Sequence, residues 1–386
     1  MARAFWVWRE LTVSSPVLDW KAEEITSKSP VFRVAHLSDL HIVGERYGYR
    51  METGTHGPQG NGCVYSALEQ LAVIDASNPV DRILVTGDIT DAGTRAEWAA
   101  FLDMMEDFPE LRARVSFVPG NHDTNIVDRT NTGRPDLPLS TGQTLRKLRS
   151  VLALDEIQGE RVYLVDRKLG ALGPSLAQYL REGERPALLQ SLAERGTLRG
   201  RLELMRVWDA IFPLVEPPTS DTGYGVILLD SNARSNFSLT NAIGVVTPTQ
   251  LRALKSMLRG SPKNAWLIML HHQVVEYPIS GIRLSDRIGL ALMNAADVLA
   301  VIAPHASRTL VLHGHRHVDW IGRAGNITLC SGPSVSLGPE QFRGRFTIHE
   351  FTVAPSGDIQ LTSNERVKIA GGNDQTIATE RARRAA

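Results

Sequence analysis

The stretch PGNHDTN, residues 119–125, follows the apolar run RVSFV and places an amide, an imidazole and a carboxylate directly after a short predicted strand. Side chains of these types can bind a ligand or transfer a proton. A single cluster of this kind could be an ordinary turn. Its meaning therefore depends on whether other predicted strands of the chain end in the same way.

Four further apolar runs also lead directly into polar residues. FRVAHL (32–37) precedes SDLH, RILV (82–85) precedes TGDIT, AWLIML (265–270) precedes HHQ, and TLVL (309–312) precedes HGHRH. Helical spacing separates some of these runs, as at 63–76, and Thr94 with Glu97 forms a capping-box pattern for a helix to about Phe108. Alternating strands and helices predict parallel pairing, and the carboxyl ends of such strands share an edge where ligands bind.

The remaining runs predict a mixed rather than a purely parallel fold. YGVILLD (224–230) is a predicted strand, Thr247-Pro248 marks a helix start, and another helix is expected around 285–303. NITLC (326–330), RFTIHEFTV (345–353) and DIQLT (358–362) predict antiparallel strands joined by turns. The fold class expected is therefore α/β with mixed sheets.

Residues 129–222 interrupt this rhythm with helix-like pieces of mixed charge and no chemical cluster. We interpret them as an inserted helical subdomain that forms a cap or a contact surface. The predicted organisation is a first part of the main domain at 1–128, the insertion at 129–222, a second part at 223–365 and a polar tail at 366–386.

Composition excludes several classes of protein. The chain has 386 residues, 42% of them hydrophobic, and 42 basic residues balance 42 acidic ones, which argues against a general electrostatic nucleic-acid binder. The two cysteines, Cys63 and Cys330, exclude a disulfide scaffold and suit buried thiols in a reducing compartment. The start lacks a secretory pattern, and no run approaches the ~18 apolar residues of a membrane span. We expect a cytoplasmic protein, with FWVW (5–8) in an edge strand rather than at a membrane.

The polar strand ends contain the donors of a metal site. Seven of the eleven histidines lie just past a predicted strand, together with Asp39, Asp88, Asn121 and Asp123. Carboxylates, imidazoles and an amide without thiolate suit Mn, Fe, Zn, Co or Ni. There are too many donors for one tetrahedral ion, so two divalent ions that share a bridging carboxylate fit the count better. Asp-x-His and His-x-His on extended chain direct both side chains to one face.

In the order DLH, GD, GNHD, HH and GHRH, these segments resemble the calcineurin-like metallophosphoesterase family over roughly residues 32 to 350, with the insertion outside. The neighbourhood GDITDAGTRAEW is similar to the branch with bacterial cyclic-nucleotide and glycerophosphodiester phosphodiesterases. The resemblance implies a four-layer sandwich of two mixed β-sheets with helices outside.

The resemblance also implies a role for each candidate residue. Asp39, His41 and His317 would hold one metal, Asp88 would bridge both, and Asn121, His271 and His315 would hold the second. His122 would be a catalytic residue that binds no metal and stabilises the transition state or protonates the leaving oxygen. The family often has a proline soon after the HH pair, whereas this chain reads HHQVVEYP; His271 is preferred to His272 because it lies nearest the strand end.

Other residues receive structural interpretations. Asp123 is expected to cap a turn or to orient a histidine, and His313 to lie behind the site or in the core. His36, His56, His305 and His349 show no partner pattern and are taken as structural. In the loop 44–62, Arg46 and Tyr47 could contact substrate, although a solvated loop is the simpler interpretation.

The function expected is hydrolysis of a small phosphodiester by in-line attack of a metal-bridging hydroxide, with a small phosphate ester as partner and a homo-oligomer as assembly. A phosphomonoesterase, a nucleotide or lipid-linked pyrophosphatase and a nuclease are alternatives, and zero net charge counts against the last. A non-catalytic scaffold predicts missing ligand positions, and none is missing from the motifs.

Overall fold

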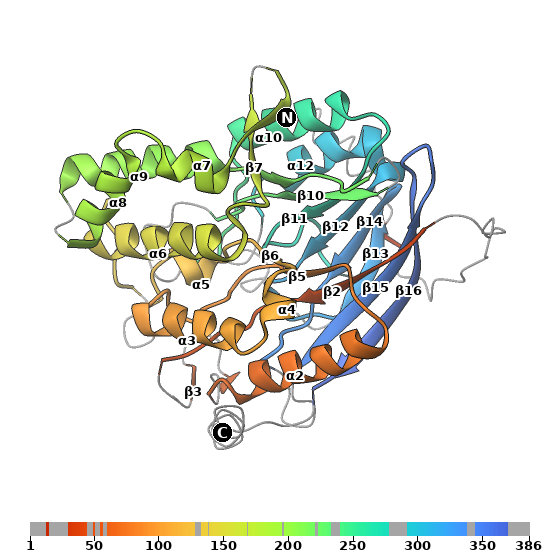
Figure 1. Ribbon diagram of the computed structural model, residues 1–386, viewed down its shortest axis with the longest axis horizontal. Helices are drawn as coiled ribbons and strands as arrows, with labels where there is room; N and C mark the ends of the chain where they lie inside the picture. Colours follow the sequence, from red (N-terminus) through yellow and green to blue (C-terminus); the bar gives the residue numbers. More distant parts are fainter. Residues whose placement is uncertain are drawn as a thin grey trace.

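The computed structural model describes residues 13–14, 30–44, 49–50, 55–56, 60–127, 133–137, 139–167, 169–194, 197–220, 223–232, 240–277, 292–337 and 344–369. Two mixed β-sheets pack face to face, and helices cover both outer faces, which confirms the predicted four-layer sandwich (Figure 1).

The strands of the nine-stranded sheet, in chain order, are β1 (Val13–Ser14), β7 (Tyr163–Asp166), β8 (Ala171–Ser175), β9 (Leu214–Glu216), β10 (Tyr224–Leu228), β11 (Ala265–Met269), β12 (Thr309–His313), β13 (Trp320–Ala324) and β14 (Ile327–Ser331). The five-stranded sheet contains β2 (Val31–Leu37), β5 (Arg82–Val85), β6 (Val115–Phe117), β15 (Arg345–Val353) and β16 (Ile359–Lys368), and β3 (Tyr49–Arg50) pairs with β4 (Thr55–His56).

The helices are α2 (Gly62–Ser77), α3 (Arg95–Glu106), α4 (Pro109–Arg112), α5 (Asn121–Thr124), α6 (Thr141–Gln158), α7 (Leu176–Arg181), α8 (Arg185–Glu194), α9 (Leu198–Ile211), α10 (Pro248–Gly260), α12 (Ala295–Ile302) and the 3-10 helix η2 (Ala303–Arg308). Helices α2 and α3 cover the five-stranded sheet, and α10 and α12 cover the nine-stranded sheet (Figure 1).

Each sheet combines a group of neighbouring parallel strands with antiparallel strands beside it. In the nine-stranded sheet the order is β1-β13-β14-β12-β11-β10-β9-β7-β8, and β10, β11, β12 and β14 run parallel. In the five-stranded sheet the order is β16-β15-β2-β5-β6, and β2, β5 and β6 run parallel. All five predicted ligand segments follow strands of these two parallel groups.

The alternation of side chains along β11 shows how one strand serves two cores. Leu267 and Met269 face the cluster between the sheets, whereas Trp266 and Ile268 face the cluster under α10 and α12. Successive strand side chains point to opposite faces, so a strand covered on both sides is apolar throughout. This explains why the run AWLIML has no polar position.

The structure confirms most of the predicted elements and corrects two. The capping box of Thr94 and Glu97 is present at the start of α3. NITLC was predicted beside the two strands that follow it, but β14 lies in the other sheet, between β12 and β13. The helix expected around 285–303 is present as Ala295–Ile302, and residues 285–291 lie outside the described residues.

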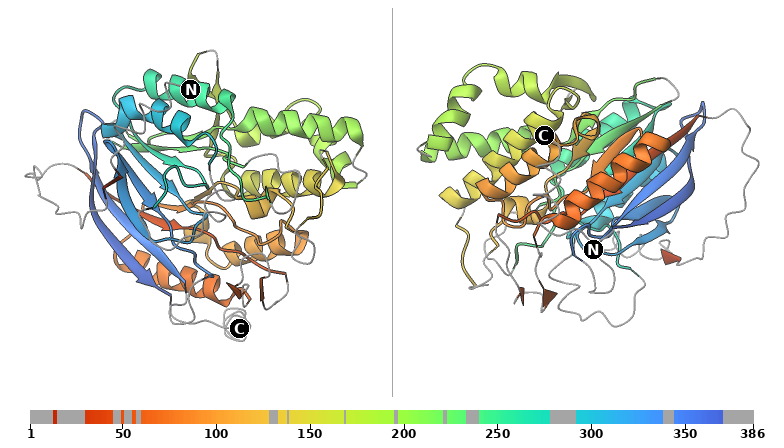
Figure 2. Two further views of the ribbon diagram at one scale, coloured as in Figure 1. Left: turned by 180° about the vertical axis from the view of Figure 1, so that it is seen from behind. Right: turned by 60° about the horizontal axis from the view of Figure 1, so that its bottom comes forward.

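Residues 129–222 are not wholly helical. Helices α6 to α9 pack beside the sheets (yellow to green in Figure 2), but β7, β8 and β9 extend the nine-stranded sheet. Sequence reasoning missed these strands because they are short and β8 contains Gly173 and Pro174. Proline is tolerated there because β8 is the outermost strand and needs no partner on its free side. The boundaries of this segment as a separate domain stay a prediction.

Within the described residues, no helix is long and apolar enough to cross a membrane. Cys330 is fully buried and Cys63 is partly exposed, so the prediction of two buried thiols holds for Cys330 only.

Candidate metal centre

The predicted ligand segments of both sheets meet at one place. The loop after β2 bonds to the loop after β5 through Asp39 N and Gly87 O at 3.0 Å and through His41 N and Asp88 O at 2.9 Å. The two sheets are joined where His315 N donates to Asp39 Oδ2 at 3.1 Å. Backbone hydrogen bonds and one carboxylate therefore bring together segments that are almost 280 residues apart in the sequence.

The backbone at these positions is strained. Six described non-glycine residues have positive φ, and five of them are predicted ligands; the five are Asp39, His41, Asp88, His315 and His317. Positive φ is unfavourable for residues with a Cβ and tends to occur at functional sites. Gly87, with φ of +97°, must be glycine because a Cβ would lie 2.5 Å from the ring of His271.

The first donor cluster contains Asp39, His41 and His317. His317 Nε2 lies 3.3 Å from both Asp39 Oδ1 and His41 Nε2, and His41 Nε2 lies 4.0 Å from Asp39 Oδ1. Asp39 and His41 are buried, whereas the side chain of His317 is 31% exposed. The cluster therefore opens to solvent on the side of His317.

The second donor cluster contains Asp88, Asn121, His271 and His315. His271 Nε2 lies at its centre, 3.1 Å from Asn121 Oδ1, 3.1 Å from His315 Nδ1 and 3.3 Å from Asp88 Oδ2. All four side chains are buried.

Asp88 connects the two clusters. Its Oδ2 atom lies 3.3 Å from His271 Nε2 and also 3.9 Å from His41 Nε2. Its other oxygen, Oδ1, accepts a hydrogen bond from the backbone N–H of His122 at 2.9 Å. The carboxylate is thus held in place by one oxygen while the other faces both clusters.

Two central histidines are oriented by groups behind them. Asp91 Oδ1 lies 3.1 Å from His41 Nδ1, and the carbonyl oxygen of Thr86 accepts from His271 Nδ1 at 2.8 Å. These contacts place the Nδ1 proton and leave Nε2 to face the site, as is common for metal-binding histidines. Sequence reasoning missed Asp91; its position three residues after Asp88 in GDITD was the available signal.

The pKa values of the buried groups in the site are shifted by burial and by one another. Burial alone would raise the pKa of Asp88, but His271 and His122 hold it well below its ordinary value. Burial lowers the pKa of His271, yet the Asp88 carboxylate outweighs this and raises it to about 9. Burial and the neighbouring His272 and His271 keep the pKa of His315 well below its ordinary value.

The donor geometry fits a metal ion. Neutral His271 would direct the lone pair of Nε2 at three acceptor-bearing neighbours, so a proton or a metal ion is needed among them. Asp39 Oδ1 is buried and accepts no hydrogen bond within the described residues, although His317 Nε2 is nearby. Buried carboxylate, imidazole and amide donors without a thiolate suit borderline or hard divalent ions.

His122 lies beside the clusters but differs from the predicted ligands. Its Nδ1–H donates to the backbone carbonyl of Asp91 at 2.8 Å, and its ring meets that of His41 edge to face at 4.7 Å. Its side chain is 14% exposed. The fixed Nδ1–H leaves Nε2 as the atom that can exchange a proton with a bound ligand.

The neighbouring residues take structural positions. The two oxygens of Asp123 accept hydrogen bonds from the backbone N–H groups of Ile89, Thr90 and Gly120. This carboxylate therefore caps the loops, which is one of the two roles predicted for it. His272 Nδ1 lies 2.9 Å from Ser231 Oγ. His313 is buried against Tyr277, behind the site. Arg46 and Tyr47, the possible substrate contacts, lie outside the described residues.

A line of buried polar groups supports the site from behind. His349 Nδ1 lies 2.6 Å from Asn364 Oδ1, and His349 Nε2 lies 3.2 Å from His36 Nδ1. On the other side of the His36 ring, Nε2 lies 3.0 Å from Thr86 Oγ1. The Thr86 hydroxyl donates to Ser38 Oγ at 2.8 Å, directly before the first predicted ligand. Burial keeps the pKa of His36 and of His349 below the ordinary value, so both histidines are neutral in this line of buried polar groups. They bear out the prediction that His36 and His349 are structural.

A two-sheet α/β sandwich whose strand ends gather carboxylates and imidazoles defines a metal-binding protein class. Residues 32–189 match the model of the calcineurin-like phosphoesterase family, which confirms the resemblance seen in the motifs. The match continues into the segment interpreted as an insertion.

Two curated relatives carry the name probable cyclic nucleotide phosphodiesterase. The chain is 33% identical over 98 residues to one from Coxiella burnetii, which covers 25% of this chain and 34% of that protein. It is 33% identical over 122 residues to one from a Synechococcus strain, which covers 32% of this chain and 44% of that protein. The chain therefore spans less than half the length of either relative.

Among solved structures, a dimetal phosphatase from Danio rerio is similar at 16% identity, with coverage of 88% of this chain and 100% of that one and a TM-score of 0.45. That degree of likeness supports no argument about function.

Proposed function

We propose that the chain is a metal-dependent phosphodiesterase with a dinuclear centre built around Asp88. The observation that carries this proposal is the position of one carboxylate oxygen, 3.3 Å from His271 Nε2 and 3.9 Å from His41 Nε2. Asp39, His41 and His317 would hold one ion with Asp88, and Asn121, His271 and His315 would hold the other.

Bound divalent ions would supply Lewis acidity, which neutralises charge on a phosphate group and makes water a nucleophile near neutral pH. The chain itself supplies rigid placement. Strained backbone, the contact of Asp91 with His41 and that of Thr86 with His271 fix the donors before a substrate arrives. Such preorganisation lowers the barrier because nothing has to rearrange during the reaction.

His122 is suited to proton transfer at the leaving group. Its Nδ1–H is held by the backbone carbonyl of Asp91 at 2.8 Å, and Asp91 Oδ1 lies 3.7 Å from the same nitrogen, so the orientation of the ring is fixed. A protonated His122 would present Nε2–H to the open side of the site. General acid catalysis of this kind contributes about 10²–10⁴-fold to the rate.

The substrate class we favour is a small phosphodiester, such as a cyclic nucleotide or a glycerophosphodiester. The names of the two curated relatives support this class. The balanced charge of the chain, with 42 basic and 42 acidic residues, speaks against a polymeric nucleic acid. A phosphomonoesterase and a pyrophosphatase remain alternatives, because the same fold hosts different substrates.

The test compares hydrolysis of bis(p-nitrophenyl) phosphate and p-nitrophenyl phosphate by metal-stripped protein with Mn²⁺ added back. Metal-dependent cleavage of the diester, absent from Asp88→Ala, would support the proposal. Cleavage of the monoester alone would make the protein a phosphomonoesterase. If two metal ions bind and neither ester is cleaved, this simple diester reaction is refuted and a selective substrate or a non-catalytic scaffold follows.

A further inference from the structure

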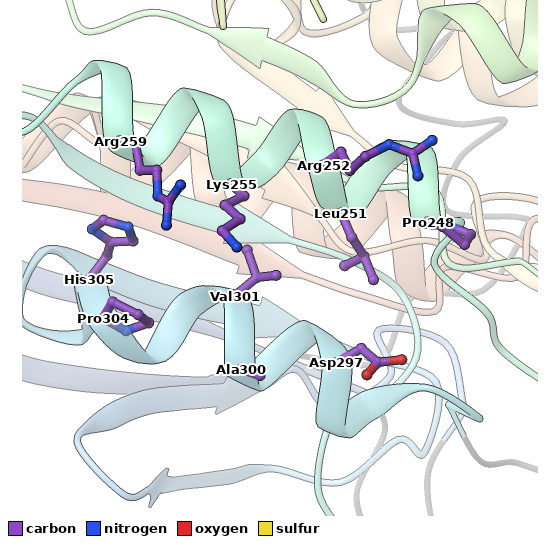
Figure 3. A pocket seen from close by; sticks show the side chains of 10 residues that line it. All are labelled: Pro248, Leu251, Arg252, Lys255, Arg259, Asp297, Ala300, Val301, Pro304 and His305. Carbon is purple, nitrogen blue, oxygen red and sulfur yellow. The ribbon is translucent and has the colours of Figure 1, made fainter. Parts of the chain in front are cut away.

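A groove of about 520 Å³ lies between α10 and α12 on the outer, helix-covered face of the nine-stranded sheet (Figure 3). The metal centre lies elsewhere, at the carboxyl ends of the parallel strands. A volume of this size falls in the range of small-molecule sites. The groove therefore raises the question of which ligand its walls would accept.

One end of the groove carries several hydrogen-bond donors. Lys255 and Arg259 extend from α10 toward the groove, and His305 faces them from η2 (Figure 3). Arg308 Nη2 donates to His305 Nδ1 at 2.9 Å, so the neutral ring carries its own proton on Nε2. An ammonium, a guanidinium and an imidazole N–H thus gather at this end.

Three basic residues, Arg252, Lys255 and Arg259, line the groove against one acidic residue, Asp297. In the described part of the chain, neither Lys255 nor Arg259 forms a salt bridge, and both side chains are exposed. The helix PTQLRALKSMLRG contains no acidic residue. Arg308 is directed to the carbonyl oxygens of Leu258, Ser261 and Asn264. A net positive field over the groove follows.

The middle of the groove is apolar. Leu251 from α10 and Val301 from α12 form its floor between the basic end and Asp297 at the opposite end (Figure 3). Pro304 adds a rigid apolar edge next to His305. A matching ligand would combine an anionic group with an apolar or aromatic body.

We propose that this groove binds a small phosphomonoester, with its phosphate between Lys255, Arg259 and His305 and its organic part on Leu251 and Val301. Guanidinium and ammonium groups are common binders of phosphate oxygens. A phosphomonoester carries about −1.5 to −2 charge at neutral pH, whereas a diester carries a single negative charge. Several cations therefore attract a phosphomonoester more strongly than a diester.

A phosphomonoester is also the product class of the proposed reaction, and this part of the inference rests on the proposed function. Hydrolysis of a phosphodiester adds water across one P–O bond and yields an alcohol and a phosphomonoester. The groove would therefore bind the product class in preference to the substrate class, at a site separate from the metal centre.

The test is equilibrium dialysis of the full chain with radiolabelled adenosine 5′-monophosphate, with metal present and after chelation. Inorganic phosphate and 3′,5′-cyclic AMP serve as competitors. The variant Lys255→Ala/Arg259→Ala removes two cations from the groove. The matched control Arg199→Ala/Arg206→Ala removes two exposed cations from α9, at another side of the molecule.

We expect binding that survives chelation, that the groove variant weakens about tenfold or more, and that the control leaves unchanged. Cyclic AMP should compete less well than the monophosphate. Binding that disappears on chelation and ignores the groove variant would overturn the proposal, as would no binding at millimolar ligand. Inorganic phosphate competing as well as the nucleotide would refute the role of the apolar floor.

Failure of the proposed function gives a different result. If the diester assay shows no hydrolysis while the monophosphate still binds the groove as described, the phosphomonoester site stands and only its link to the product is lost.

Discussion

Replacing Asp91 with asparagine should weaken one of the two proposed metal sites and spare the other. Asp91 Oδ1 lies 3.1 Å from His41 Nδ1, and both side chains are buried, so the carboxylate orients the ring and increases the basicity of Nε2. Loss of such a partner typically weakens metal affinity by about 10–100-fold, or roughly 1.4–2.8 kcal/mol. His271 is oriented by the carbonyl of Thr86, which the substitution leaves in place.

The substitution should not unfold the protein. Burial and the nearby carboxylates of Glu97 and Asp123 raise the pKa of Asp91 well above its ordinary value, so the charged form is costly in the metal-free protein. A neutral amide of the same shape removes that cost. His122 also keeps its hydrogen bond, because its Nδ1–H donates to the backbone carbonyl of Asp91, which the substitution leaves in place.

The assay is a competition titration of the metal-free protein with Mn²⁺ against a chromophoric chelator. Asp103→Asn, an exposed position on α3, is the matched control. In a His315→Ala background, which disables the second cluster, Asp91→Asn should weaken the remaining site by the same factor. Equal weakening of both sites, or no change in either, would refute the argument.

The remaining predictions concern the shared carboxylate, the proton donor and pH. Asp88→Ala should reduce bound metal below that of the wild type, measured by elemental analysis; full retention of metal would rule out a shared carboxylate. His122→Ala should keep its metal and lose about 10²–10⁴-fold in turnover of a diester with a poor leaving group; an unchanged rate would remove its proposed role. Burial lowers the pKa of His349 to about 4. The unfolded chain therefore binds more protons at this histidine than the folded protein does. The contribution of His349 to the free energy of unfolding is full above about pH 6.5 and falls by roughly 3 kcal/mol as the pH decreases toward 4. His349→Gln should flatten this slope in urea denaturation, and an unaltered slope would show that other groups cause it.

Sequence reasoning found much of the candidate site because short-range patterns carry it. Each ligand segment follows an apolar run, and the run and its polar end lie within about ten residues. The capping box at Thr94 and the strand at 265–269 are local features of the same kind. Residue type and spacing were enough to select Asp39, Asp88 and His271 as candidates.

Other features are invisible without the tertiary structure. Asp91 sits in a loop where a carboxylate is ordinary, and only the approach of His41 gives it a role. Short strands such as β7 to β9 and β13 carry too few residues for a period to show. They become strands by antiparallel pairing on the two flanks of the parallel strands β10, β11, β12 and β14. The donors at the groove between α10 and α12 are ordinary surface cations until packing brings the two helices together.

The sequence by itself determined which residues can bind metal and that they follow strands. Whether Asp39 of one sheet would meet His315 of the other was decided by the packing of the two sheets, which brings His315 N to 3.1 Å from Asp39 Oδ2. The physical reason is range. Backbone periodicity and turn chemistry act over a few residues, whereas the distance from His271 to Asp88 is set by two sheets, their cores and the strained loops between them.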